Sequence, residues 1–235
     1  MAASIKTNHL RKVYGSCIAV DDLTTDFYAG QVVALLGENG AGKSTLLNMM
    51  VGFLKPTSGE VLINGDNIAV NPEKVKKEIG FLPEGSPLYE DMKVSDFLSY
   101  MAELKGVERN QVLQAIKLAN LADVVECQIE TLSKGFRRRV GFAVSLLGNS
   151  PIMILDEPTD GLDPNQKAHL LGLISDMGKE KTIIISTHLL DEAQAIAGRI
   201  MVMHKGIIKI DGDVESILRR TRTISLESAF IKLTR

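Results

Sequence analysis

The stretch Gln31–Thr45, QVVALLGENGAGKST, joins a short apolar run to a glycine-rich loop that ends in Gly-Lys-Ser-Thr. Gln31–Leu36 is typical of a buried strand, and Leu46–Met50 is rich in helix formers, with Gly52 placed to end that helix. The loop between them matches G-x-x-x-x-G-K-[ST], a pattern whose glycines let successive backbone N–H groups face a phosphate. The order strand, loop, helix disfavours the alternative of an ordinary glycine-rich turn with a solvated lysine. We therefore expect this chain to bind a nucleoside triphosphate.

Each part of this loop has an expected role. Lys43 can reach the β- and γ-phosphates, and the hydroxyl of Ser44 is suited to ligating Mg²⁺. The start of the following helix offers its positive end to the anion. The remaining residues of the expected phosphate cradle are Gly37, Glu38, Asn39, Gly40, Ala41, Gly42 and Thr45.

Two further apolar runs place polar groups at strand ends. Ile152–Leu155 leads into Asp156 and Glu157, and Thr182–Ser186 leads towards His188. An amphipathic helical pattern, Gln166–Met177, separates the two runs, which predicts a parallel sheet covered on both faces. Ligands of such sheets bind at the carboxyl ends of the strands. We expect Asp156 to hold Mg²⁺ through water, Glu157 to polarise an attacking water, and His188 to contact the γ-phosphate.

Other segments complete an α/β fold. Ser4–Val13 and Leu23–Phe27 show partial strand alternation, and Glu60–Gly65 ends in Asn-Gly, a strong hairpin signal. Ser95–Lys105 and Asn110–Asn120 carry apolar residues at helical spacing, which predicts a helical insertion over about 94–132. We expect one domain over 1–235, with a mostly parallel core sheet, an N-terminal antiparallel β portion and a helical subdomain.

Composition excludes several classes of protein. The 27 basic and 29 acidic residues give a net charge of −2, so no bulk positive field favours nucleic acid. The longest apolar run, Val140–Leu147, is far shorter than the roughly 18–20 residues that span a bilayer. Residues 1–6 lack the apolar core of a secretion signal, which favours the cytosol. Cys17 and Cys127 have no metal-ligand spacing, and we expect each to be a buried or idle thiol.

Together these motifs resemble the nucleotide-binding subunit of ABC transporters, a P-loop NTPase, over nearly the whole chain. Leu132–Phe136, LSKGF, is similar to the family signature LSGGQ, although Lys134 and Phe136 depart from it. The resemblance implies that Ser133 and Gly135 contact the γ-phosphate bound to the other subunit of a head-to-tail dimer. Read by itself, Ser133 is also a good N-cap for a helix.

Four more positions fit the family pattern. Tyr14 stands where the family stacks an aromatic ring on adenine, and His188 matches its switch histidine. Asp160–Asp163 resembles the D-loop, the segment that joins the two nucleotide sites. Phe81–Glu84 occupies the position of the Q-loop, with Glu84 where most members have glutamine. Glutamate can still ligate Mg²⁺, so we expect retained activity with altered metal affinity.

The resemblance implies an ATP-hydrolysing subunit that uses Mg²⁺ and powers a separate transmembrane permease. ATP would close a dimer of nucleotide-binding subunits, formed with a second copy of the chain, and hydrolysis would open it. The permease would dock near Pro87–Met92 and hold the chain at the cytoplasmic side of the membrane. The tail from Gly212 is similar to the exporter-type branch, which pairs with a separate permease.

Two alternatives remain at this stage. One is a soluble ABC-type ATPase that acts on ribosomes or DNA, which the single cassette, the absence of sustained heptads and the net charge disfavour. The other is a regulatory module that binds nucleotide without hydrolysing it. The intact Lys43, Asp156, Glu157 and His188 argue against that module. Lys134 and Phe136 in the signature leave room for it.

Overall fold

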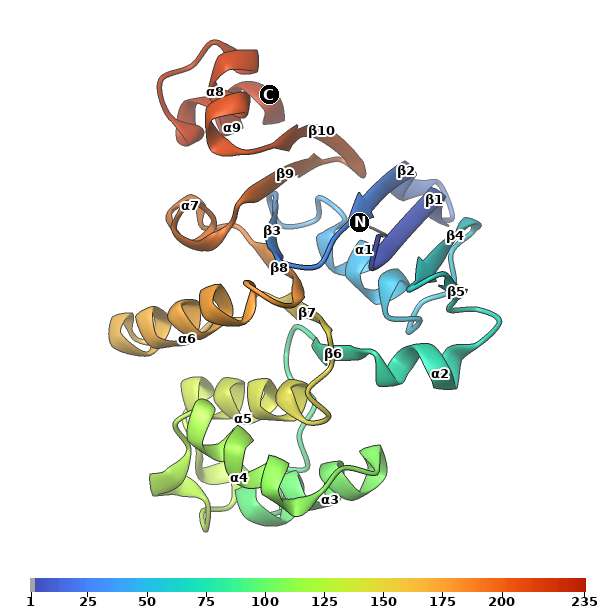
Figure 1. Ribbon diagram of the computed structural model, residues 1–235. Helices are drawn as coiled ribbons and strands as arrows, with labels where there is room; N and C mark the ends of the chain where they lie inside the picture. Colours follow the sequence, from blue (N-terminus) through green and yellow to red (C-terminus); the bar gives the residue numbers. More distant parts are fainter. Residues whose placement is uncertain (1–2) are drawn as a thin grey trace.

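A six-stranded sheet forms the centre of the computed structural model, which describes residues 3–235 (Figure 1). Its strand order is β10-β9-β3-β8-β7-β6, parallel throughout except for β10, which runs antiparallel to β9. The strands are β3 (Gln31–Leu36), β6 (Ile79–Leu82), β7 (Ile152–Asp156), β8 (Thr182–Thr187), β9 (Arg199–His204) and β10 (Ile207–Gly212). The three predicted apolar strands are thus confirmed as neighbours in a parallel sheet. Residues 1–6 are expected to lack a secretion signal. Of these, Met1 and Ala2 lie outside the described residues.

The buried strands serve two cores. Along β3, Val33 and Leu35 pack into one apolar cluster, whereas Ala34 and Leu36 pack into the other. The first cluster joins the sheet to α1 (Lys43–Met50) and the antiparallel strands, and the second joins it to most of the other helices. This double burial explains why β3 reads as a continuous apolar run.

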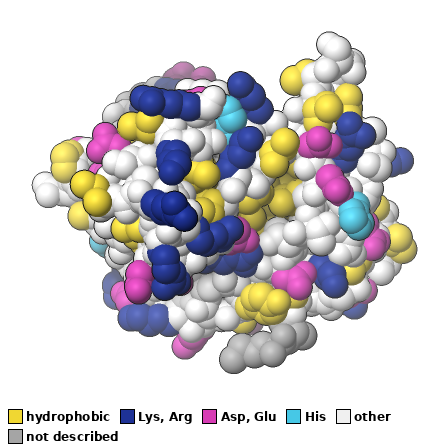
Figure 2. Space-filling view, turned by 90° about the horizontal axis from the view of Figure 1, so that it is seen from above, with side chains coloured by type: hydrophobic (Ala, Val, Ile, Leu, Met, Phe, Trp, Pro, Cys, Tyr) yellow, Lys and Arg dark blue, Asp and Glu magenta, His cyan; other side chains and the backbone are white. Residues whose placement is uncertain are grey.

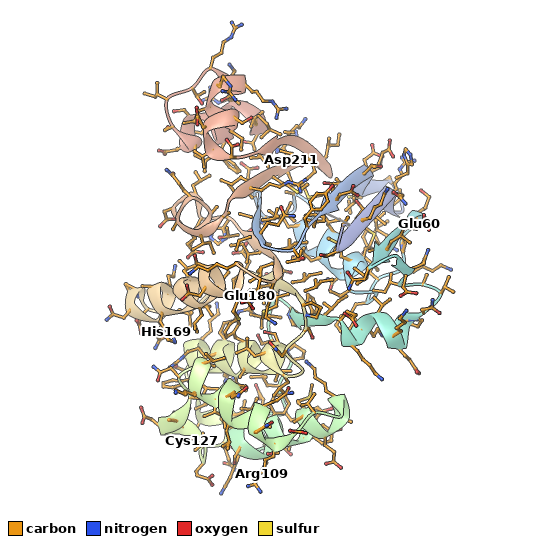
Figure 3. The ribbon with its side chains drawn as sticks, viewed as in Figure 1. Glu60, Arg109, Cys127, His169, Glu180 and Asp211 are labelled. Atoms are coloured by element: carbon orange, nitrogen blue, oxygen red, sulfur yellow. The ribbon has the colours of Figure 1, made fainter. Side chains whose placement is uncertain are left out.

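A second sheet is antiparallel, as expected, with the order β2-β1-β4-β5. Its strands are β1 (Ile5–Tyr14), β2 (Cys17–Phe27), β4 (Ser58–Ile63) and β5 (Asp66–Asn67). The predicted hairpin turn is confirmed at Asn64 and Gly65, whose φ angles are 48° and 87°. Glu60 (Figure 3) accepts hydrogen bonds from the side chains of Asn8 and Asn67 and so ties β1, β4 and β5 together.

Two boundaries differ from those predicted. The second strand begins at Cys17 rather than Leu23, because its pairing with β1 continues to the Tyr14–Cys17 pair. The helix after the phosphate loop begins at Lys43 rather than Leu46, so the end of the loop motif is itself helical. Gly52, with a φ of 74°, follows the end of that helix as expected.

The helical insertion contains α3 (Val94–Lys105) and α4 (Arg109–Leu118), with Gly106 in the left-handed conformation between them. Two short 3₁₀ turns follow at Ala122–Val124 and Ile129–Thr131. The next helix, α5 (Lys134–Leu146), packs against α3, α4 and strand β6. The helical layer therefore continues beyond the expected 94–132, and α5 is its connection to the central sheet (Figure 1).

The remaining helices border the central sheet. They are α2 (Pro72–Lys77), α6 (Pro164–Met177), α7 (Leu190–Ile196), α8 (Val214–Thr221) and α9 (Leu226–Thr234). Over residues 3–235, no helix has the length and apolar character needed to span a membrane. Figure 2 shows a row of Lys and Arg side chains over the face that carries α8 and α9, so the small net charge conceals a local basic surface.

The two cysteines are far apart and unpaired. Cys127 lies in the helical part of the molecule (Figure 3) and is partly buried. Cys17 is exposed, at the start of β2. Of the two predicted alternatives, a buried or an idle thiol, Cys17 is therefore not the buried one, because β2 begins at a turn on the surface.

Candidate nucleotide site

The loop between β3 and α1 has the conformation that an anion site requires. Gly42 precedes α1 with a φ of 105°, and a Cβ there would run into the backbone carbonyl of Ala19. Within the described chain, no side chain caps this helix start. Its first N–H groups are therefore left for an external acceptor, and the helix dipole favours a negative one.

Lys43 is buried and bends back over the loop. Its ammonium donates to the carbonyls of Gly37 and Glu38 at 2.7 and 3.3 Å. It also lies 3.6 Å from Oε1 of Glu157. The structure thus brings the phosphate loop and the end of β7 together around one positive charge.

Asp156 and Glu157 are held by Ser186, which lies near the end of the neighbouring strand β8. The Ser186 hydroxyl donates to Oδ1 of buried Asp156 and accepts from the backbone N–H of Glu157 at 2.9 Å. Glu157 has a φ of 48°, a region that non-glycine residues rarely adopt and that often marks functional sites. Its Oε2 lies 3.0 Å from Nδ1 of His188. The carboxylate of Glu157 therefore lies between a lysine and a histidine, as predicted for the carboxyl edge of the sheet.

The expected metal ligands lie on three segments. The Ser44 hydroxyl lies 3.4 Å from Oε2 of Glu84, which brings the phosphate loop and the segment after β6 together. Asp156 adds a buried carboxylate at the end of β7. A hydroxyl with one or two carboxylates is the protein oxygen set that Mg²⁺ uses when it also binds a phosphate and water. These residues fit Mg²⁺.

The signature segment starts α5. The Ser133 hydroxyl accepts from the backbone N–H of Phe136 at 3.3 Å, which confirms the N-cap interpretation. A Cβ on Gly135 would lie 2.8 Å from the carbonyl of Gly161, so the helix start packs closely against the D-loop segment. Lys134 adds an ion pair across that contact, with Nζ 2.8 Å from Oδ2 of Asp160.

Three expected ligand-binding residues lie apart from the central group. Among the described residues, no hydrogen bond or ion pair joins Tyr14, Ser133 or Gly135 to Lys43 or Glu157. The Tyr14 ring is half exposed at the end of β1, with the ammonium of Lys12 5.1 Å from its centroid.

Three residues that sequence reasoning missed support the site. Ser186 holds the carboxylate of Asp156 and the backbone N–H of Glu157, as described above. Glu192 on α7 accepts from the hydroxyls of Thr159 and Thr187 at 2.7 and 3.2 Å, which joins the loops after β7 and β8. Arg138 on α5 donates to the carbonyls of both Asp156 and Glu157. The run Arg137–Arg139 was visible in the sequence, but nothing there distinguished the member that contacts the site, Arg138, from the other buried one, Arg139.

The surroundings of Arg138 shift the pKa of its guanidinium in two opposite directions. Burial lowers the pKa of this guanidinium, whereas the nearby carboxylates of Asp156, Asp160, Glu157 and Glu84 act in the opposite direction. Arginine remains protonated in proteins even with such a shift. The site therefore contains two buried positive groups, Lys43 near the carboxylate of Glu157 and Arg138 at the backbone carbonyls of Asp156 and Glu157.

Comparisons with known proteins agree with this geometry. A family model described as ABC transporter matches residues 20–160. The uncharacterised ABC transporter ATP-binding protein MJ1023 of Methanocaldococcus jannaschii is 34% identical over 94% of this chain and 81% of its own length. The phospholipid-transporting ATPase ABCA3 of Homo sapiens is 35% identical over 90% of this chain, which spans 13% of that relative.

Solved structures have the same fold. A structure of an ATP-binding subunit of an ABC transporter has a TM-score of 0.90 at 28% identity, covering 98% of this chain and 99% of its own. The dimeric structure of the ATP-binding cassette MJ0796, in a post-hydrolysis state with ADP and Pi, has a TM-score of 0.83 at 26% identity and covers 89% and 98%. The family model, the archaeal relative and these structures show that the chain belongs to the ABC transporter family, as an ATP-binding domain with the P-loop NTPase fold.

Proposed function

We propose that this chain is the ATP-hydrolysing subunit of an ABC transporter. The observation that carries the proposal is the position of the Glu157 carboxylate, 3.6 Å from Lys43 and 3.0 Å from His188 beside the phosphate loop. Glu157 accepts a proton from the attacking water, and His188 orients that water and the γ-phosphate. Lys43 and the start of α1 stabilise the charge that develops on the phosphate oxygens.

The proposal includes a Mg²⁺ ion bound with ATP. Ser44, Glu84 and Asp156 are the residues that would hold it. When bound beside ATP, the ion neutralises phosphate charge. Tyr14 would stack on the adenine, and the backbone of residues 37–45 would surround the phosphates.

One proposed partner is another nucleotide-binding subunit, and a second copy of this chain could be that subunit. Ser133 and Gly135 lie at the start of α5, where Ser133 caps the helix, and would complete the site of the partner subunit. The dimeric state of the similar cassette MJ0796 supports this arrangement. ATP would then stabilise the closed dimer, and hydrolysis would release it.

A membrane permease is the second proposed partner. An apolar groove of about 270 Å³ lies between the central sheet and α3, lined by residues that include Phe81, Phe97 and Met101. Phe53, 68% exposed, stands at this groove with its ring 5.3 Å from that of Phe81. An apolar groove with an exposed phenylalanine at its edge is typical of an interaction site. It supports a transporter, held peripherally at the cytoplasmic side of the membrane, over an ABC-type ATPase without a transport role.

The variant Glu157→Gln tests the proposed chemistry. It keeps the shape of the side chain but removes the proton acceptor, so we expect Mg-ATP turnover to fall by about 100-fold or more while ATP binding persists. The control Glu180→Gln changes an exposed carboxylate remote from the site and should turn over normally. Turnover of Glu157→Gln near that of the wild type would reject Glu157 as the base.

The same variant tests the dimer. Because slow hydrolysis prolongs the ATP-bound state, size exclusion with light scattering should show a shift from monomer to dimer when Mg-ATP is added. A persistent monomer would contradict self-pairing, with ATP binding measured separately by equilibrium dialysis.

A further inference from the structure

Arg138 joins the two loops that follow the neighbouring parallel strands β6 and β7. One edge of its guanidinium, Nη1, donates to the carbonyl of Pro83 and to the hydroxyl of Ser86, both at 2.7 Å. The other edge, Nη2, donates to the carbonyls of Asp156 and Glu157, the latter at 2.9 Å. The first loop contains Glu84, and the second contains the proposed catalytic carboxylate.

Only an arginine side chain suits this position. The guanidinium is planar and rigid, and its two terminal nitrogens carry four N–H donors directed towards different sides. A lysine ammonium is a single point and cannot hold two loops apart at a fixed spacing. The contact at Glu157 has a special value, because the φ of 48° at that residue persists only where surrounding contacts hold it.

The loop on the Nη1 side also lines the apolar groove. Pro83, Ser86 and Gly141 all face that groove. Gly141 follows Arg138 by one turn of α5, and a Cβ at Gly141 would lie 2.6 Å from Oγ of Ser86. Segment 83–86 is thus packed directly on α5, and an occupant of the groove that shifts this segment also shifts two hydrogen-bond acceptors of Arg138.

We propose that Arg138 is a positioning residue that transmits displacement of segment 83–86, at the apolar groove, to the backbone of Asp156 and Glu157. The proposal rests on the proposed function and deepens it, since it names the side chain through which groove occupancy reaches the catalytic carboxylate. Arg138 touches neither ATP nor the attacking water; it acts through the position of Glu157.

The first part of the test separates positioning from general stability. We expect Arg138→Gln to lower kcat for Mg-ATP by about 10- to 100-fold, as a small misplacement of a catalytic group does, and to change KM by less than about twofold. Arg138→Lys should restore only part of kcat. The matched control is Arg139→Gln, since Arg139 is equally buried (7% exposed against 5%) but donates to the carbonyl of Asn120 in the helical layer.

The second part tests transmission with a displacement built into the chain. Gly141→Ala pushes on Ser86 and replaces no residue of the site. We expect Gly141→Ala to change kcat when Arg138 is present. When it is combined with Arg138→Gln, we expect the same kcat as for Arg138→Gln alone. Ser86→Ala, which removes one acceptor of Arg138, provides a milder displacement if Gly141→Ala folds poorly.

Hydrogen–deuterium exchange gives a readout that needs no turnover. Gly141→Ala should alter amide exchange in both 83–88 and 156–160 when Arg138 is present, and only in 83–88 in Arg138→Gln. Three outcomes would each overturn the proposal. The first is an equal loss of kcat in Arg138→Gln and Arg139→Gln, and the second is additive effects of Gly141→Ala and Arg138→Gln on kcat. The third is that Gly141→Ala alters exchange in 156–160 to the same extent with and without Arg138. A wild-type chain without ATP turnover would reject the proposed function, while the exchange experiment still decides the role of Arg138.

Discussion

The buried carboxylate of Glu192 should stabilise the loops that carry the catalytic residues. Its side chain is 4% exposed and accepts from two buried hydroxyls, those of Thr159 and Thr187. Lys167 is its ion-pair partner at 3.2 Å and is one-third exposed. In Glu192→Ala both hydroxyls lose their acceptor inside the protein, at roughly 1–3 kcal/mol each, whereas Lys167 regains water. We expect the free energy of unfolding to fall by about 3 kcal/mol.

This loss is measurable by thermal unfolding. For a chain of this length 1 kcal/mol corresponds to roughly 2–4 °C, so Tm should fall by about 6–12 °C. Both hydroxyls donate to the same oxygen, Oε2, so Glu192→Gln keeps an acceptor for both and should lose less than half as much. Asp191→Asn, at the exposed neighbouring position, is the control and should change Tm little. A fall of less than about 2 °C in Glu192→Ala would refute the reasoning, because it would mean that the two threonine hydroxyls find other partners.

Three further predictions concern the proposed metal ligand Glu84, the ion pair of Lys134 and the two cysteines. Glu84→Gln removes a carboxylate near Ser44 and should raise the Mg²⁺ concentration for half-maximal turnover; an unchanged Mg²⁺ titration would exclude Glu84 as a ligand. Lys134→Ala breaks an ion pair whose side chains are 71% and 51% exposed, so calorimetry should show a change in unfolding free energy below about 1 kcal/mol, and a larger one would indicate a structural role. A colorimetric thiol reagent should modify exposed Cys17 quickly and partly buried Cys127 slowly, and equal rates would contradict this difference in burial.

Local sequence was sufficient for the phosphate loop and the edge of the sheet. The G-x-x-x-x-G-K-[ST] pattern fixes spacing within one strand, one loop and one helix, so Lys43 and Ser44 could be assigned without a fold. Asp156 and Glu157 could be placed because an apolar strand of a parallel sheet delivers its last residues to one edge. The structure places Lys43, Glu157 and His188 together, as these arguments predicted.

The ends of the strands and helices could be predicted less well from the sequence. β2 is longer than its alternation suggested, since pairing with β1 rather than burial determines where it begins. The conformation of Glu157 also had no sequence signal, because glutamate gives no reason to expect a positive φ.

From the amino-acid sequence alone, the phosphate loop, the proposed catalytic carboxylates and the family resemblance followed, because each depends on residues close together in the chain or on one strand end. The tertiary structure decided which side chains support them. Arg138 meets Pro83 across 55 positions, and Thr159 meets Glu192 across 33. Such contacts depend on how strands and helices pack, and a buried arginine or glutamate looks in sequence like any exposed one. The groove beside α3 likewise exists only once the helical layer is packed against the sheet.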